Sequence, residues 1–498
     1  MGSRAKRFSP AYRGSMAPEE FDVIVIGGGP AGENAAAYAI AGSGRTAALI
    51  EHELVGGECS YWACMPSKAL LRPVEVLGTA RHMPGVEEKV NAYGLDVEAV
   101  LARRDGFTHN HDDSSQVLWA DSVGIDVIRG SAKLTGVREV TVGERVLRAR
   151  HAVVLATGTT ASVPDLPGLR DALPWTSRDA TNVREVPKRL AIVGGGVVAC
   201  EAATWLHELG ADDITVLVRG SALLERTEPF AGEMVAEKMR KHGVNVRFGA
   251  SLESVTRGDV SDTGIGRIHG GPVTLTVRGD DGDPELTVDE ILVAAGRTPA
   301  TAGLGLERVG LPDHGYVTVD DHLTVQGVDG DWLYAVGDTN GRALLTHMGK
   351  YQARVCGDVI AARAEGRPLD GPRFVASADH GQVPQVVFTT PEVAAVGRTE
   401  SQSRADGLDV EVVEVDIDVA GAALSRDDYS GRASLVVDRA TDTIVGATFV
   451  GSGVAELVHA ATVAVVGKVP LESLWHAVPS YPTVSEVWLR LLEARRAQ

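Results

Sequence analysis

Cysteine is scarce in this chain, with four residues among 498. Residues 1–15 carry several basic side chains but lack the apolar stretch of a secretory signal. Few cysteines and no signal predict a cytoplasmic protein, in which a cysteine pair is usually redox-active rather than structural. We expect residues 1–15 to be a disordered extension.

Long apolar runs are also absent, since no uninterrupted stretch reaches the roughly 20 residues of a membrane-spanning helix. Acidic residues outnumber basic ones by 67 to 48, giving a formal net charge of −19. This charge argues against nucleic acids and anionic membranes as partners. The length exceeds what one core can organise, so two to four domains are expected. The 57 glycines suit an α/β protein with tight turns between strands and helices.

Two of the cysteines, Cys59 and Cys64, lie five residues apart within residues 56–68, Gly-Gly-Glu-Cys-Ser-Tyr-Trp-Ala-Cys-Met-Pro-Ser-Lys. Five residues of helix rise about 7.5 Å, whereas disulfide-bonded Cα atoms lie about 4.4–6.8 Å apart. A disulfide here therefore needs a distorted turn and is more easily reduced than a structural one. We expect the next helix to begin near Pro66, its N-terminus lowering the pKa of a nearby thiol. Two buried, inert thiols are the alternative.

A metal site is not predicted. A zinc site would need a second ligand pair at similar spacing, and the sequence has none. His109 and His111 lie within residues 69–123, a stretch predicted to be largely helical, and we expect both on the surface.

A dinucleotide-binding fingerprint follows the first apolar strand, residues 21–26. Gly27, Gly29 and Gly32 have the Gly-x-Gly-x-x-Gly spacing and lead into an alanine-rich helix. Such glycines let the backbone approach a pyrophosphate at the helix N-terminus. Glu51 ends the next predicted strand, where an acid binds a ribose diol. A glycine loop serving packing alone is the alternative.

A second fingerprint follows the apolar run of residues 190–193. Gly194, Gly196 and Ala199 repeat the spacing, with alanine as a permitted third residue. Two such units imply two nucleotides, and together with a cysteine pair they favour FAD and a nicotinamide cofactor.

The nicotinamide cofactor is predicted to be NADPH. The strand of residues 214–218 ends in Arg219, where an NAD-binding protein would place an acid, and Arg226 follows. Arginine at this point can bind the 2′-phosphate of NADP. NADH remains possible if Arg219 is only a solvated charge at a strand end.

The flanks of the cysteine pair, Gly-Gly-x-Cys-x4-Cys-x-Pro-Ser-Lys, resemble the redox-active segment of the pyridine nucleotide–disulfide oxidoreductases. The segments Ala-Thr-Gly (156–158) and Val-Gly-Asp (336–338) resemble flavin-binding segments of that family, and residues 290–299, which include Gly296 and Arg297, close the second nucleotide unit. By this resemblance Cys64 is the flavin-side thiolate, Cys59 the outer thiol, and Lys68 pairs with Glu201 near the flavin. The further residues expected to bind the cofactors are Gly57, Lys68, Thr157, Gly158, Gly296, Arg297, Gly337 and Asp338.

The C-terminal segment departs from the family pattern. Disulfide reductases of this family carry His-Pro-Thr-x-Ser-Glu, whose His, oriented by the Glu, serves dithiol interchange in the partner subunit. Here Tyr481 replaces the His while Glu486 is retained, as in mercuric reductase, but the chain lacks that enzyme's C-terminal cysteine pair. A tyrosine, with a reference pKa of about 10, is not a ready base at neutral pH. His476 is an alternative base.

The predicted fold is α/β, with two Rossmann-like nucleotide-binding domains and an α+β C-terminal dimerisation domain. The FAD domain is expected at residues 16–166 and 299–366, the NAD(P)H domain at 167–298 and the dimerisation domain at 367–498. By resemblance, a homodimer passes electrons from NADPH through FAD and Cys59–Cys64 to a small-molecule acceptor: a quinone, a metal ion or an unusual disulfide. A conventional disulfide reductase with a relocated base and a non-catalytic flavin-binding protein are the alternatives.

Overall fold

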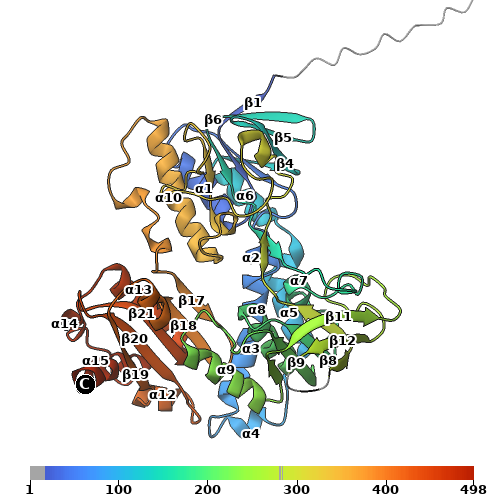
Figure 1. Ribbon diagram of the computed structural model, residues 1–498, viewed down its shortest axis with the longest axis vertical. Helices are drawn as coiled ribbons and strands as arrows, with labels where there is room; N and C mark the ends of the chain where they lie inside the picture. The colour runs from blue at the N-terminus through green and yellow to red at the C-terminus, as the bar shows by residue number, and fades with distance from the viewer. Residues whose placement is uncertain (1–16, 280–281, 283, 498) are drawn as a thin grey trace, which may run out of the picture.

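The computed structural model describes residues 17–279, 282 and 284–497, so the predicted extension, residues 1–15, lies outside the described residues. Three bodies make up the fold (Figure 1). The first unit, at the top, contains a seven-stranded sheet; the second unit, at the lower right, contains a four-stranded parallel sheet; and the C-terminal domain, at the lower left, contains a five-stranded sheet. In the part of the chain described, no helix is long and apolar enough to span a bilayer.

The first unit is built on the strand order β3-β2-β1-β6-β5-β4, with β16 also beside β6. The predicted apolar strand lies in β1, which pairs in parallel with β2 and β6. The alternating sequence pattern of residues 127–150 predicts a small antiparallel sheet, and this prediction is only partly right. Residues 132–150 form it, but β3 joins β2 in parallel because Ile125 and Ile128 extend the buried core. The elements are β1 (Glu19–Ile26), α1 (Pro30–Ile40), β2 (Ala47–Glu51), α6 (Ser114–Ser122), β3 (Ile125–Arg129), β4 (Ala132–Gly136), β5 (Glu139–Val142), β6 (Arg145–Leu155), β16 (Leu333–Ala335), η3 (Gly337–Asn340) and α10 (Thr346–Ala364).

The second unit has the parallel order β10-β9-β8-β14 and an added antiparallel sheet, β11-β12-β13. Its strands are buried runs of β-branched and leucine residues, as expected for a parallel sheet covered on both faces. The elements are α7 (Ser177–Thr181), β8 (Arg189–Val193), α8 (Val197–Glu208), β9 (Asp213–Val218), α9 (Pro229–Lys241), β10 (Asn245–Phe248), β11 (Ser251–Arg257), β12 (Val273–Arg278), β13 (Glu285–Val288) and β14 (Glu290–Val293).

The chain passes between the two units twice, and the two passages lie side by side. Strand β7 (Thr159–Ala161) pairs antiparallel with β15 (Arg297–Pro299), so the two crossings form one two-stranded ribbon. Polar stretches near residues 166–171 and 300–305, which from the sequence alone mark the expected crossings, follow these strands. This ribbon brings residues of both units close to the redox segment, residues 56–68.

Helices link the redox segment to the second unit. The helix predicted to begin near Pro66 begins at Cys64, because Ala63 already has the non-helical backbone that starts it. The predicted helical character of residues 69–123 is confirmed, with turns around residues 81–86 and 91–96. The elements are α2 (Gly57–Tyr61), α3 (Cys64–Ala80), α4 (Glu87–Val90), α5 (Val97–Phe107) and η1 (His109–His111).

The C-terminal domain is an antiparallel sheet of order β17-β18-β21-β20-β19 covered by helices. The sequence pattern of this domain predicts strands at 410–417, 433–437 and 444–450, and these strands are confirmed within a few residues. It also predicts a helix at 453–467, which begins as a short 3₁₀ turn before α13. The elements are β17 (Pro384–Val387), β18 (Glu392–Gly397), α11 (Glu400–Ala405), β19 (Val410–Asp416), α12 (Ala420–Ser425), β20 (Arg432–Asp438), β21 (Thr443–Gly451), η6 (Val454–Glu456), α13 (Leu457–Val466), α14 (Leu471–Leu474), η7 (Val484–Glu486) and α15 (Val487–Ala497).

Candidate functional site

The two cysteines lie on either side of a break between two helices. Cys59 is in α2 and Cys64 is the first residue of α3. Trp62 and Ala63, which separate the helices, have non-helical backbone angles. The distorted turn predicted from the spacing is therefore present. Both cysteines are free thiols of intermediate burial, and their side chains hydrogen-bond each other.

The electrostatics separate the two thiols. The hydrogen bond from Cys59 holds the pKa of Cys64 well below its ordinary value, with help from Thr346 and from the nearby Lys68 charge. Thr346 Oγ1 lies 3.2 Å from Cys64 Sγ. The same Cys59–Cys64 hydrogen bond, with burial, raises the pKa of Cys59. The pair is thus arranged to hold one thiolate, on Cys64, with Cys59 as the proton donor to it.

Lys68 and Glu201 form a charged pair that joins all three bodies. Lys68, one turn along α3 from Cys64, places Nζ 2.8 and 3.1 Å from the two carboxylate oxygens of Glu201, on α8. Glu201 is only 3% exposed, and the backbone N–H of Phe388 donates a 2.9 Å hydrogen bond to its Oε1. Lys68 Nζ also lies 4.9 Å from the centre of the Phe388 ring. A buried carboxylate needs such partners, which fix the lysine beside the thiols.

The first glycine loop leaves its backbone open for a ligand. Gly27 has a φ of +106°, and a Cβ there would lie 2.2 Å from Ala156 O. A Cβ on Gly32 would lie 1.9 Å from Gly27 O, so both positions demand glycine for packing. Gly29, in contrast, has nothing closer than 4.0 Å on that side and caps α1 without a side-chain hydrogen bond. The free N–H groups at this helix N-terminus fit a pyrophosphate.

Two further predicted residues frame the first glycine loop. Glu51 ends β2, is buried, and accepts hydrogen bonds of 2.7 Å from the N–H groups of Gly28 and Glu53. Gly57 packs against the loop: its φ is +58°, and a Cβ there would lie 2.7 Å from Gly29 Cα. Gly57 therefore allows the redox segment to approach the loop closely.

The predicted second flavin segment lies beside the crossing ribbon. Asp338 Oδ2 accepts a 2.6 Å hydrogen bond from Thr159 Oγ1, and burial raises the pKa of this carboxyl. Arg297 donates to Thr159 Oγ1 and to the Thr159 carbonyl oxygen, at 2.9 and 2.6 Å. Thr157 Oγ1 is buried and has no hydrogen-bond partner among the described residues, as expected of a group that faces a ligand.

Three glycines around this segment adopt backbone conformations that other residues rarely take. Gly158, Gly296 and Gly337 have φ values of +69°, +130° and +67°. The N–H of Gly158 bonds Thr339 Oγ1, and that of Gly337 bonds Gln352 Oε1. Gly158 and Gly337 follow the ends of the neighbouring parallel strands β6 and β16, so both turns lie at the same edge of that sheet, and Gly296 directly precedes β15 of the crossing ribbon.

The second glycine loop repeats the first. Gly194 has a φ of +132°, and a Cβ there would lie 2.4 Å from Ala294 O, while Ala199 is fully buried. Gly196 caps α8 without a side-chain hydrogen bond, and the space on its Cβ side is open. Arg219 and Arg226 are exposed and form no ion pair among the described residues. The loop and both arginines therefore fit a second dinucleotide.

The C-terminal segment lies apart from the cysteine pair in its own chain. Tyr481 is 77% exposed, and Glu486 lies in η7 with a buried Oε2 that has no hydrogen-bond partner among the described residues. His476 is exposed as well. Tyr481 and His476 thus face outward, whereas the Glu486 carboxylate is partly buried.

Sequence reasoning missed several residues of the site. Thr346, Phe388 and Arg178 reach it from α10, from the start of the C-terminal domain and from α7, and no spacing pattern marks them. His111 is also placed wrongly by the sequence. It is half-buried, with its ring 6.1 and 5.7 Å from those of Tyr61 and Trp62. The aromatic residues between the cysteines were the only available indication.

Most of the chain matches known families. Residues 21–366 match the family described as pyridine nucleotide-disulphide oxidoreductase, and residues 383–492 match its dimerisation domain.

Individual proteins similar to this chain in sequence or in structure are oxidoreductases of the same kind. A dihydrolipoyl dehydrogenase of Chlamydia muridarum is 30% identical over 94% of this chain and 96% of the relative, and a mercuric reductase of Staphylococcus aureus is 29% identical over 94% and 81%. The Cu(II) complex of RclA, an HOCl-induced flavoprotein disulfide reductase of Escherichia coli, is similar in structure. Its TM-score is 0.78 at 25% identity, over 95% of this chain and 99% of RclA.

Proposed function

Because the chain belongs to the pyridine nucleotide–disulphide oxidoreductase family, whose members use FAD and NAD(P)H, we propose that it passes electrons from NADPH to an acceptor other than a common small disulfide. Family membership makes the chain an enzyme, a flavoprotein disulfide reductase, which sets aside a non-catalytic flavin-binding protein. Its dimerisation domain supports a homodimer. We propose a quinone, a metal ion or an unusual disulfide as acceptor, and the cytoplasm as its location.

In this proposal the redox segment carries the electrons. When bound, FAD supplies electron-pair transfer between NADPH and the Cys59–Cys64 pair. Cys64 is the thiolate on the flavin side, stabilised by Thr346 and Lys68, and Cys59 is the outer thiol that meets the acceptor. Glu201 holds Lys68 in place.

The remaining predicted residues bind the two nucleotides. Gly27, Gly29 and Gly32 admit the FAD pyrophosphate, and Glu51 and Asp338 bind its ribose and ribityl hydroxyls. Gly194, Gly196 and Ala199 form the equivalent loop for NADPH. Support for the 2′-phosphate comes from Arg219 and Arg226, whose charges are not neutralised by an ion pair within the described chain.

The observation that carries the choice of acceptor is Tyr481. Transfer of electrons to an external disulfide needs a proton donor for the leaving thiol, and general acid–base help is worth roughly 10²–10⁴-fold. Near neutral pH a phenol is a much weaker acid than an imidazolium and a much weaker base than an imidazole, so tyrosine does not replace the usual histidine in this step. Acceptors that take electrons without this proton transfer keep their rate, because the rate gain from acid–base catalysis does not apply to them. The names of two similar proteins, a mercuric reductase and a Cu(II) complex of RclA, support metal ions among them.

A second candidate is a conventional disulfide reductase in which His476 supplies the base. It is favoured by two relatives named dihydrolipoyl dehydrogenase, each 30% identical to this chain. Under this alternative, changing His476 to Gln lowers disulfide reduction strongly.

The test is a screen of acceptors with the FAD-loaded dimer and NADPH: glutathione disulfide, lipoamide, a benzoquinone, Hg(II) and Cu(II). We expect quinone or metal-ion turnover to exceed disulfide turnover by at least about tenfold, since the missing base affects only the latter. Rapid reduction of lipoamide or glutathione disulfide that His476→Gln abolishes would contradict the proposal and establish the second candidate.

A further inference from the structure

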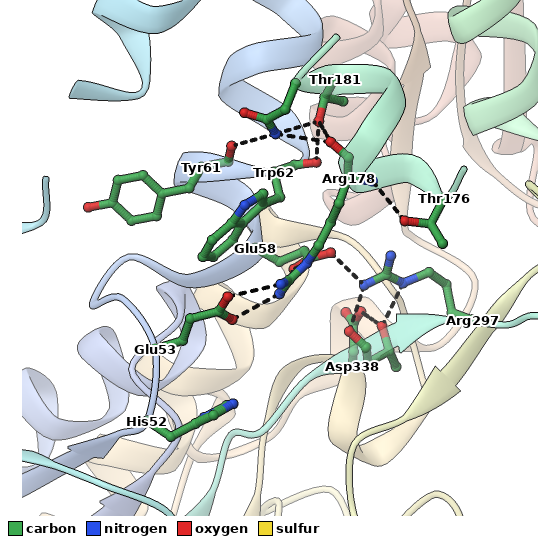
Figure 2. Close-up of polar contacts among 12 residues, drawn as sticks. His52, Glu53, Glu58, Tyr61, Trp62, Thr176, Arg178, Thr181, Arg297 and Asp338 are labelled. Atoms are coloured by element: carbon green, nitrogen blue, oxygen red, sulfur yellow. Dashed lines mark hydrogen bonds and ion pairs between the residues drawn. The ribbon is translucent and has the colours of Figure 1, made fainter. Parts of the chain in front are cut away.

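Arg178, in α7 of the second unit, reaches across to the redox segment (Figure 2). Its guanidinium donates to Glu58 from Nε and Nη2, at 3.0 and 2.7 Å, and to Glu53 from Nη1 and Nη2, at 3.0 and 3.1 Å. The same guanidinium lies 4.1 Å from the ring centre of Trp62. Glu58 directly precedes Cys59, and Trp62 lies between the two cysteines, so one side chain contacts the segment on both sides of Cys59.

Two more side chains, from the C-terminal end of α7, bind the backbone between the cysteines. Thr181 Oγ1 donates a 2.9 Å hydrogen bond to the carbonyl oxygen of Trp62 (Figure 2). Asn182 Nδ2 lies 3.4 Å from the carbonyl oxygen of Tyr61. These carbonyls end the short helix α2, where the helix itself cannot provide donors. The second unit therefore supplies the hydrogen bonds that the redox segment lacks.

Further hydrogen bonds and burial hold both sides of this contact in place. Helix α7 begins with a capping box in which Thr176 and Asp179 bond each other's backbone. On the other side, Tyr61 is fully buried and Trp62 is 6% exposed, and Tyr61 Oη donates a 3.0 Å hydrogen bond to the Val55 carbonyl oxygen. A planar, five-donor guanidinium that is both stacked and bidentate holds a geometry that a lysine or a solvated ion pair would not.

The charged groups continue to the predicted flavin segment. Arg297 lies 3.6 Å from Glu58, and its positive charge acts on Asp338, where it opposes the rise that burial causes in the pKa of that carboxyl. Glu53, Arg178, Glu58, Arg297 and Asp338 thus alternate in sign from the redox segment through both units (Figure 2).

We propose that Arg178 and Thr181 are positioning residues that hold Tyr61 and Trp62 so that the Cys59 and Cys64 sulfurs stay adjacent, which makes the second unit a determinant of the pair's redox equilibrium. The inference rests on the proposed function only in taking Cys59 and Cys64 as a redox pair. A segment held with its two sulfurs adjacent loses less freedom when the disulfide closes. The contacts with α7 therefore favour the disulfide over the dithiol.

The redox step balances with dithiothreitol as the only partner. Oxidation of the two thiols forms one S–S bond and releases two electrons and two protons. These reduce the cyclic disulfide of oxidised dithiothreitol to its dithiol, and the reverse reaction opens the protein disulfide.

The experiment equilibrates the FAD-loaded dimer, without oxygen, with mixtures of reduced and oxidised dithiothreitol. The Cys59–Cys64 disulfide is then quantified by mass spectrometry after thiol alkylation. Arg178→Gln should shift the equilibrium toward the dithiol by about three- to tenfold, because several immobilised side chains each contribute about a factor of two or more. Thr181→Val, which removes one hydroxyl from a buried position, should shift it in the same direction by about two- to threefold.

The matched control is Arg189→Gln. Arg189 forms a two-nitrogen ion pair with Asp289 in the same unit and bonds none of residues 56–68 within the described chain, so its loss should leave the equilibrium unchanged. Equilibria of both variants within about 1.5-fold of the wild type, or shifts toward the disulfide, would overturn the inference. If Arg178→Gln does not fold with FAD, Thr181→Val decides alone.

This experiment uses neither NADPH nor an acceptor, so it separates the two proposals. A wild-type protein without a disulfide that dithiothreitol can reduce would defeat the proposed function itself. A normal disulfide that is insensitive to α7 would defeat only the positioning role.

Discussion

The redox segment and the C-terminal segment are built in opposite ways. Around Cys59 and Cys64, the charged groups Lys68 and Glu201 are paired, and the segment is bonded to elements of both nucleotide units. In the C-terminal segment, Tyr481 is exposed, and Glu486 has a buried oxygen without a hydrogen-bond partner within the described chain. Under the proposed function, one chain supplies every group that the entry of electrons needs. The route by which they leave depends on what meets the exposed segment.

The largest expected effect comes from removing Cys64, on the side of the site where electrons enter in the proposed function. Cys64→Ser removes the thiolate and with it one of two electron-pair stores, so anaerobic reduction should take up one electron pair where the wild type takes up two. Turnover that passes through the cysteine pair should fall by about 10³-fold or more. Cys356→Ala is the control, since Cys356 is a fully buried thiol on α10 whose pKa burial raises. An equal loss in both variants would contradict the assignment of the pair.

Much of this entry side could be predicted from the sequence. The glycine fingerprints sit between an apolar strand and a helix, so Gly27 and Gly194 are fixed by local chain geometry that a sequence pattern records. The same holds for the break between Cys59 and Cys64, which follows from the spacing. Local sequence patterns are enough to predict site residues where all of them lie in one short segment of the chain.

The partners of these residues could not be predicted in the same way. Phe388 N–H reaches Glu201 from a residue 187 positions away, and Arg178 reaches Glu58 across 120 positions. Such contacts depend on how whole units pack, which no local periodicity encodes. The parallel pairing of β3 with β2 was missed for the same reason, since the neighbour of a strand depends on how the whole sheet packs.

The next largest effect concerns cofactor preference, for which the residue at the end of the second strand differs between the two nucleotide units. The first ends β2 in Glu51 and the second ends β9 near Arg219. Arg219→Glu should lower the preference for NADPH over NADH by about 10- to 100-fold, because a charged hydrogen bond to a phosphate is worth about 1.5–3 kcal/mol. The ratio of kcat/KM for the two cofactors measures it.

Lys241→Glu supplies the control for Arg219→Glu. It makes the same change of charge on exposed α9 of the same unit, where Lys241 pairs only with Glu237 within the described chain. If both variants change the preference alike, the effect is long-range charge and the arginine has no specific contact with the phosphate.

The smallest effect concerns the thiolate itself. The Thr346 hydrogen bond helps to lower the pKa of Cys64, so Thr346→Val should raise that pKa and leave less thiolate at any pH below it. In the dithiothreitol-reduced protein, alkylation of Cys64 at pH 6.5 should slow by about three- to tenfold, while the rate at pH 9 stays nearly unchanged. Thr462→Val, which removes a hydroxyl bonded within α13, should change neither rate. A uniform slowing at both pH values would indicate altered access instead.

The central claim, that electrons enter normally but leave without the usual base, is tested most directly at Tyr481. The measurement is kcat/KM with NADPH for lipoamide and for a benzoquinone, in the wild type, Tyr481→His and Tyr481→Phe. We expect Tyr481→His to raise lipoamide reduction by about tenfold or more, with Glu486 available to orient the new ring, and to leave quinone reduction within about twofold. Tyr481→Phe should change neither. Rapid lipoamide reduction by the wild type, or its loss in Tyr481→Phe, would contradict the account.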